Sequence, residues 1–101
     1  MKNLEDKTSR FISKKLNGLK PKGTIECFLD DTSSLSCKSN YSSGLLSRSE
    51  QKFFENLSKK DSSEFLAMVN KLIQKSSESN NGSIRTCLIN FNSIKFEFSY
   101  Y

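Results

Sequence analysis

The stretch INFNSIKFEFSYY, residues 89–101, decides which kind of fold this chain can adopt. It holds five of the eleven aromatic residues, and from residue 94 its side chains alternate between two faces. The apolar face consists of Ile94, Phe96, Phe98 and Tyr100. The other face consists of Lys95, Glu97, Ser99 and Tyr101. This period of two is typical of a β-strand with one buried face, so the aromatic face needs a layer of helices to cover it.

Two other segments have the helical spacing of apolar residues that such a layer requires. Residues 3–19 and residues 62–77 each place their apolar side chains on one stripe, with charged and polar residues elsewhere. Asp61 precedes the second of these segments and is its expected N-terminal cap. A shorter helix is expected to begin at Ser47, because S-R-S-E has the form of a capping box that Glu50 completes.

Three further segments have the residue types of β-strands. Residues 23–29 and 34–41 alternate around the turn-forming Asp30-Asp31-Thr32-Ser33, which predicts a hairpin. Residues 83–91 are rich in β-forming residues and would pair with 94–101 in a second hairpin. The expected order is α-β-β-α-α-β-β. We therefore predict a single α+β domain over the whole chain (1–101), with an antiparallel sheet of about four strands covered by helices.

Composition and cysteine content indicate a cytoplasmic protein. The first fifteen residues carry charges throughout, and no run of about eighteen apolar residues is present, so we expect neither a classical signal peptide nor membrane association. Export by a route that leaves no classical signal is the alternative. Cys27, Cys37 and Cys87 are odd in number and lack paired spacing, which favours three buried free thiols. A Cys27–Cys37 disulfide across the first hairpin is the alternative, and it requires an oxidising compartment.

The chain contains no histidine, which excludes the commonest chemistry of small enzymes. Catalytic Ser–His and Cys–His pairs and most catalytic zinc sites need that residue, and three scattered cysteines cannot form a four-cysteine zinc site. The four glycines are isolated, so no phosphate-binding loop is expected. We therefore expect a protein that is not an enzyme and that uses no cofactor or metal.

An acidic cluster, Asp30 and Asp31 with Glu26, leaves two interpretations open. Paired carboxylates can hold a metal or act in acid–base catalysis. Adjacent aspartates in a hairpin are more often turn formers, and we favour this interpretation. As an acidic loop tip they would also suit a basic partner.

The positive charge of the chain is concentrated at its start. The net charge is +5, and residues 1–22 carry seven basic and two acidic side chains. The first helix would therefore suit an acidic partner, phosphate or an anionic membrane, although an ordinary solvated helix is the more common case. An RNA-binding sheet needs exposed rings beside basic residues, whereas Lys95 lies opposite the aromatic face of residues 94–101, so core packing explains that face better.

The predicted layout consists of an N-terminal helix, a hairpin, helices and a closing hairpin that ends in FEFSYY. This layout resembles that of bacterial polymorphic-toxin immunity proteins, including those of contact-dependent growth inhibition. The resemblance implies an antitoxin that binds one cognate toxin domain, often a nuclease, and blocks its active site or substrate surface. Inhibitors of nucleases are often acidic, whereas this chain is basic. A toxin with an acidic interface would reconcile the two, and so would contacts through residues 23–46, whose net charge is −2.

Exposure pattern and charge predict that the partner contacts Lys14, Lys15, Glu26, Asp30, Asp31 and Tyr101. Two alternative functions stay open. One is a nucleic-acid-binding module that acts through the basic first helix. The other is a phage-encoded inhibitor of a host defence protein, which applies the same binding chemistry to a different partner.

Overall fold

The computed structural model describes residues 2–16, 21–32, 34–42, 57–79, 82, 84–92 and 95–101. Within these residues the elements follow one another as α1 (Lys2–Lys15), β1 (Lys22–Leu29), β2 (Leu35–Ser42), α2 (Lys59–Ser79), β3 (Thr86–Phe91) and β4 (Phe96–Tyr100). The α+β prediction is confirmed, and each predicted strand is present. Two of them are shorter than predicted, because β3 begins at Thr86 rather than at residue 83 and β4 covers Phe96–Tyr100 rather than 94–101. The short helix expected to begin at Ser47 lies outside the described residues.

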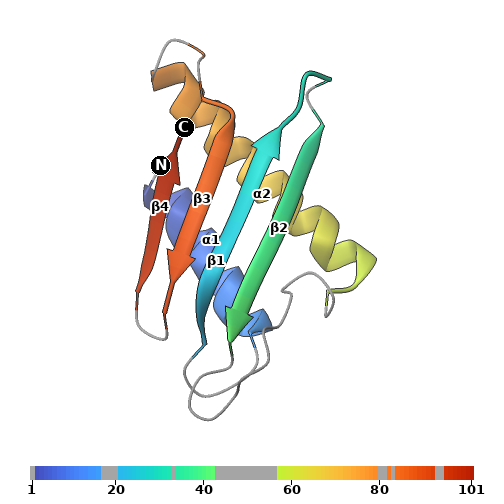
Figure 1. Cartoon of the computed structure of the whole chain (residues 1–101), viewed down its shortest axis with the longest axis vertical. Coiled ribbons are helices and arrows are strands. Elements are labelled where there is room, and N and C mark those ends of the chain that lie inside the picture. Colours follow the sequence, from blue (N-terminus) through green and yellow to red (C-terminus); the bar gives the residue numbers. More distant parts are fainter. Residues whose placement is uncertain are drawn as a thin grey trace.

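The strands form one antiparallel sheet in the order β2-β1-β3-β4. Each hairpin contributes two neighbouring strands, and β1 and β3 join the hairpins at the centre. Both helices lie on the same side of this sheet, behind it in the view of Figure 1. This two-layer arrangement results because the apolar stripes of the helices bury the apolar face of the sheet. The opposite face of the sheet carries neither α1 nor α2.

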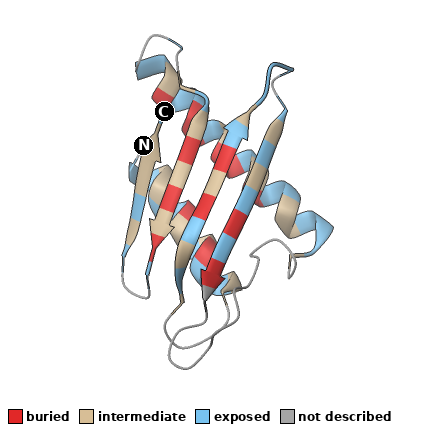
Figure 2. Ribbon diagram, in the orientation of Figure 1, coloured by how far each residue is buried: buried red, intermediate tan, exposed pale blue. Residues whose placement is uncertain are grey.

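The buried core lies between the sheet and the helices (Figure 2). Strand pairing aligns the helix-facing side chains in rows, one of which places Ile25 of β1 opposite Ile89 of β3 and continues to Phe98 of β4. The helix α2 covers these rows with buried apolar residues, namely Phe65, Met68, Val69, Leu72 and Ile73. The apolar stripe predicted for residues 62–77 is therefore the face that α2 turns to the sheet.

The aromatic face of β4 also packs against this core. Phe96 stacks on Phe91 with ring centroids 5.6 Å apart, and the Tyr100 hydroxyl donates a hydrogen bond to Oε2 of Glu5 on α1. These β4 side chains are half-buried because β4 is an edge strand. The prediction that this face serves the core, rather than an RNA-binding platform, is confirmed.

Helix α1 is shorter than the predicted helix over residues 3–19, since it ends at Lys15. Its buried residues are Thr8 and Ile12. Thr8 was not part of the predicted apolar stripe. Its hydroxyl donates a 2.8 Å hydrogen bond to the backbone oxygen of Leu4, so the polar group is satisfied inside the core.

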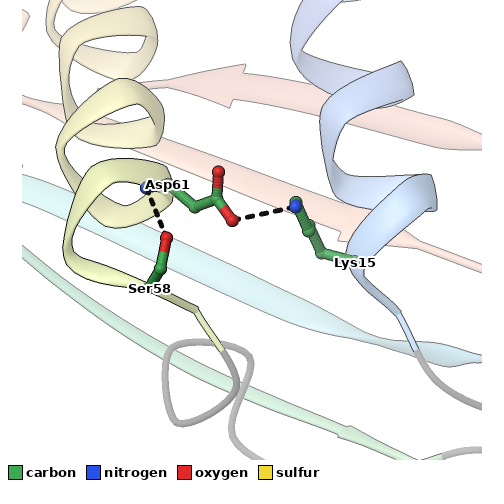
Figure 3. Close-up of polar contacts among 3 residues, drawn as sticks. All are labelled: Lys15, Ser58 and Asp61. Carbon is green, nitrogen blue, oxygen red and sulfur yellow. Dashed lines mark hydrogen bonds and ion pairs between the residues drawn. The ribbon is translucent and has the colours of Figure 1, made fainter.

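The N-terminal cap of α2 is Ser58, and the prediction that Asp61 caps this helix is wrong. The Ser58 Oγ accepts a 3.1 Å hydrogen bond from the backbone N–H of Asp61, as Figure 3 shows. The helix therefore begins at Lys59, before the predicted start, and Asp61 lies in its first turn. A carboxylate there also interacts favourably with the helix dipole.

The three cysteines lie in one row across the sheet. Cys27 pairs with Cys37 on β2 and with Cys87 on β3. Cys27 and Cys37 form a disulfide, with Cα atoms 4.0 Å apart, so the preference for three free thiols is wrong for this pair. The hairpin register explains the pairing, because it places both side chains opposite each other on the helix-facing side. Cys87 is free and buried, as expected, and burial raises the pKa of its thiol to about 12.

Candidate protein-binding surface

The face of the sheet that turns away from the helices is the candidate site. Its side chains alternate with those of the core along every strand. On this face Phe28 of β1 pairs with Thr86 of β3. Tyr101 continues the same row, because its backbone N–H donates to the Thr86 oxygen at 3.0 Å. The Thr86 N–H in turn donates to the Tyr101 oxygen at 2.8 Å. Tyr101 is thus held as an extension of β4.

Phe28 and Tyr101 are the exposed large hydrophobic residues of the described chain. Phe28 is 39% exposed and Tyr101 is 64% exposed. The short side chain of Thr86 lies between them in the row, and the half-buried Leu88 occupies the next position on the same face of β3. Two aromatic rings with an aliphatic neighbour form the kind of patch that anchors protein–protein interfaces.

Carboxylates border this aromatic patch. Glu26 pairs with Leu88 in the strand register, and its carboxylate lies 3.4 Å from the Lys38 ammonium across the β1–β2 pair. Asp31 is exposed in the β1–β2 turn, directly beyond the end of β1. An ion pair as exposed as Glu26–Lys38 contributes little stability, so both charges are available to a partner.

Asp30 organises the β1–β2 turn, as the turn-forming interpretation predicts. Its Oδ1 accepts hydrogen bonds from the Thr32 N–H at 2.8 Å, the Thr32 hydroxyl at 2.7 Å and the Ser34 N–H at 3.0 Å. The hydrogen bond from the Thr32 hydroxyl is the main reason that the pKa of Asp30 lies below its ordinary value. The carboxylate is therefore ionised at neutral pH.

Arg85 ties this turn to the start of β3. Its guanidinium donates to the backbone oxygen of Asp30, and its own backbone oxygen accepts a 2.9 Å hydrogen bond from Leu29. Its N–H donates to Tyr101 at 2.7 Å. Hydrogen bonds therefore connect the turn, the start of β3 and the extension of β4 beside the aromatic patch.

The six predicted contact residues fall into two groups on opposite sides of the molecule. Glu26, Asp30, Asp31 and Tyr101 lie around the patch, at the end of the sheet where β1 turns into β2 (Figure 1). Lys14 and Lys15 lie at the end of α1, in the helix layer. Lys14 is exposed, whereas Lys15 forms an ion pair with Asp61 at 2.9 Å. A single partner surface of ordinary size would therefore contact either the residues around the patch or the two lysines, but not both groups.

Sequence reasoning missed Phe28 and Leu88 as members of this surface. A signal for Phe28 was present, because the predicted face of β1 with Ile25, Cys27 and Leu29 leaves Phe28 on the other side. Leu88 gave no such signal, since nothing local distinguishes an apolar residue on an open face from one in the core.

The described residues hold no group of three or more potential metal ligands, and neither of their helices is long and apolar enough to cross a membrane. A scan against models of known protein families found no match, and a search of curated proteins found no relative.

Proposed function

We propose that this protein binds and inhibits another protein, as an immunity protein that neutralises a cognate toxin domain. The observation that carries the proposal is that Phe28 and Tyr101, the exposed large hydrophobic residues of the described chain, lie in one row on the face of the sheet that α1 and α2 leave open. Exposed aromatic residues at the centre of a surface and charged residues at its rim are the usual composition of a protein interface.

The carboxylates around the patch indicate the charge of the partner. Glu26, Asp30 and Asp31 outnumber the two cations near them, Lys38 and Arg85. A basic surface, such as the substrate-binding surface of a nuclease toxin, would complement this arrangement. The net charge of +5 does not oppose such contacts, because its excess lies mainly in α1, on the other side of the sheet.

The same carboxylates disfavour nucleic acid as the ligand of this surface. Phe28 and Tyr101 could stack on bases, but phosphates beside them would meet the carboxylates of Glu26 and Asp31. A phage-encoded inhibitor of a defence protein would use the surface in the same way as an immunity protein, so the identity of the bound protein distinguishes these two functions.

The proposal includes a cytoplasmic site of action, and that location bears on the disulfide. The cytoplasm keeps most thiols reduced, so Cys27 and Cys37 would be free there and joined in an oxidising compartment. Both side chains face the helices, away from the aromatic patch. We therefore expect the protein to bind its partner in either redox state.

A pull-down from lysate of the native host tests the proposal. The tagged protein is used after nuclease treatment and at about 0.3 M salt, which suppresses binding through phosphate. Phe28→Asp is compared with Thr24→Asp, because Thr24 is exposed on the same face of β1, farther from Tyr101. We expect the wild type and Thr24→Asp to retain one stoichiometric protein that Phe28→Asp loses.

The retained protein is then expressed alone and with the wild-type chain. Toxicity that the wild type suppresses and Phe28→Asp does not would support the proposal. Equal retention by the wild type and both variants would remove the aromatic patch from the interface. Recovery of only RNA or DNA, when nuclease is omitted, would overturn the inhibitor proposal and favour the nucleic-acid alternative.

A further inference from the structure

The two helices form a groove on the side of the molecule opposite the aromatic patch. They run antiparallel, because Lys15 meets Asp61 at one end and Phe11 meets Phe65 farther along. Between them lies a cavity of about 350 Å³ lined by Lys7, Arg10, Phe11, Lys14, Glu64 and Met68. We call this cavity the α1–α2 groove. Its volume suits a few side chains of a peptide.

Three cations stand along one wall of the groove. Lys7, Arg10 and Lys14 are spaced by three and four residues, which places them on one ridge of α1. All three are exposed, and none forms an ion pair with another residue that the structure describes. Lys15, by contrast, is paired with Asp61. The ridge therefore carries positive charge that the described part of the chain does not neutralise.

The floor of the groove is apolar and held in place. Met68 is only 6% exposed, and the Phe11 ring stacks on Phe65 with centroids 5.9 Å apart. The Lys15 ammonium lies 5.8 Å from the centre of the Phe11 ring. The Phe11 ring already contacts Phe65 and Lys15, so it is a poor stacking platform for a nucleic-acid base. As part of the floor it can still contact an aliphatic side chain.

Glu64 of α2 also lines the groove, opposite the three cations. Its carboxylate should affect a phosphate backbone and an acidic peptide differently. A phosphate backbone carries a charge at every nucleotide and would be repelled by this carboxylate. A peptide can place its acidic side chains against the cations and direct a backbone N–H toward Glu64. The mixture of three cations, one carboxylate and an apolar floor therefore favours an acidic peptide.

We propose that the α1–α2 groove docks an acidic segment of a protein, with its carboxylates against Lys7, Arg10 and Lys14 and one aliphatic side chain against Phe11 and Met68. This second binding surface lies in the other layer of the molecule from Phe28 and Tyr101. It is independent of the proposed inhibitor function and would allow two partners, or two parts of one partner, to bind together.

Fluorescence anisotropy with a labelled peptide of Glu and Leu residues tests this proposal at about 0.05 M salt, where exposed charges are weakly screened. A Lys and Leu peptide of the same pattern, a Glu and Ser peptide, and a single-stranded oligonucleotide are the comparison ligands. We expect the Glu and Leu peptide to bind most tightly. Replacing Leu with Ser removes the contact with the floor and should weaken binding.

The variant Arg10→Glu with Lys14→Glu should weaken peptide binding about tenfold, because it replaces two attractive charges with charges that repel the carboxylates of the peptide. The matched control is Lys22→Glu with Lys95→Glu, which makes the same change in net charge at exposed positions of the sheet layer. This control and Phe28→Asp should leave binding unchanged. Glu64→Gln should strengthen binding of the oligonucleotide relative to the peptide, because it removes the carboxylate that repels phosphate and accepts the peptide N–H.

Three outcomes would overturn the proposal. Equal weakening by both charge-reversed pairs would show general electrostatic attraction rather than a groove. Tighter binding of the oligonucleotide, with the same dependence on Arg10 and Lys14, would assign the groove to nucleic acid. Absence of peptide binding up to about 1 mM would show that the ridge is only solvated. Circular dichroism is the control for folding. We expect each variant to be folded, because the replaced residues are exposed.

Discussion

The Nζ atom of Lys15 lies 2.9 Å from Oδ2 of Asp61, so the last residue of α1 is joined to the first turn of α2 (Figure 3). The two residues belong to helices that are far apart in the sequence, and both are only partly exposed. Lysine at the end of one helix and aspartate at the start of the other also complement both helix dipoles. The pair therefore connects the two helices at this end of the molecule.

Asp61→Asn should make the free energy of unfolding less dependent on pH in the acidic range. The hydrogen bond from Lys15 lowers the pKa of Asp61 below its ordinary value of 3.8, and a hydrogen bond from Thr32 lowers that of Asp30. A carboxyl that is more acidic in the folded state stabilises it fully above about pH 4 and loses this effect as the pH falls through the lowered pKa.

Urea unfolding at about pH 6 and at about pH 2.5 measures this dependence. The variant should be less stable than the wild type at the higher pH, and the difference should shrink at the lower pH. In a Lys15→Met background Asp61→Asn should have a smaller effect. An unchanged difference at the two pH values would show that the ion pair does not contribute to stability.

Gly23→Ala should destabilise the sheet, because a side chain at this position has no space. A Cβ atom there would lie 2.2 Å from the backbone oxygen of Asn40 and 2.6 Å from the Cα of Tyr41. Backbone atoms cannot move aside as a flexible side chain can, so we expect a loss of about 1–3 kcal/mol in the free energy of unfolding. Thr24→Ala, at the exposed neighbouring position, should change it far less in the same urea titration.

Tyr100→Phe should lower the free energy of unfolding by about 1.5–3 kcal/mol, the usual contribution of a hydrogen bond to a charged group. The Tyr100 hydroxyl donates to Glu5 and thereby joins β4 to α1. Burial and this hydrogen bond both raise the pKa of the Tyr100 phenol. The matched control is Tyr101→Phe, which removes an exposed hydroxyl from the adjacent residue. Equal effects of the two variants in thermal unfolding would contradict this role of Tyr100.

Reduction of the Cys27–Cys37 disulfide should destabilise the protein by about 2–3 kcal/mol, as the closure of a short loop implies. Chemical unfolding with and without dithiothreitol measures this difference. Cys27→Ala with Cys37→Ala should be insensitive to the reductant.

Cys87 should resist alkylation in the native state, because burial and the charge of Glu5 raise its pKa to about 12. Fast labelling of Cys87 without denaturant would contradict this expectation.

The elements of the fold were predictable because their signals are local. Alternation from residue 94 and helical spacing over residues 62–77 each arise within one segment, so the strands, α2 and the helix-on-sheet arrangement follow from the sequence. One error came where two nearby residues compete for one role. Ser58 and Asp61 can both cap a helix, and only the course of the backbone decides between them.

The sequence by itself determined an α+β domain without histidine, with its positive charge concentrated at the start and an aromatic strand packed into the core. Only the tertiary structure decided that Phe28 and Tyr101 share one row, and that Lys14 lines a groove on the other side. The physical reason is that strand order, register and helix packing join distant segments. A shift of one residue in register would move every side chain of a strand to the other face.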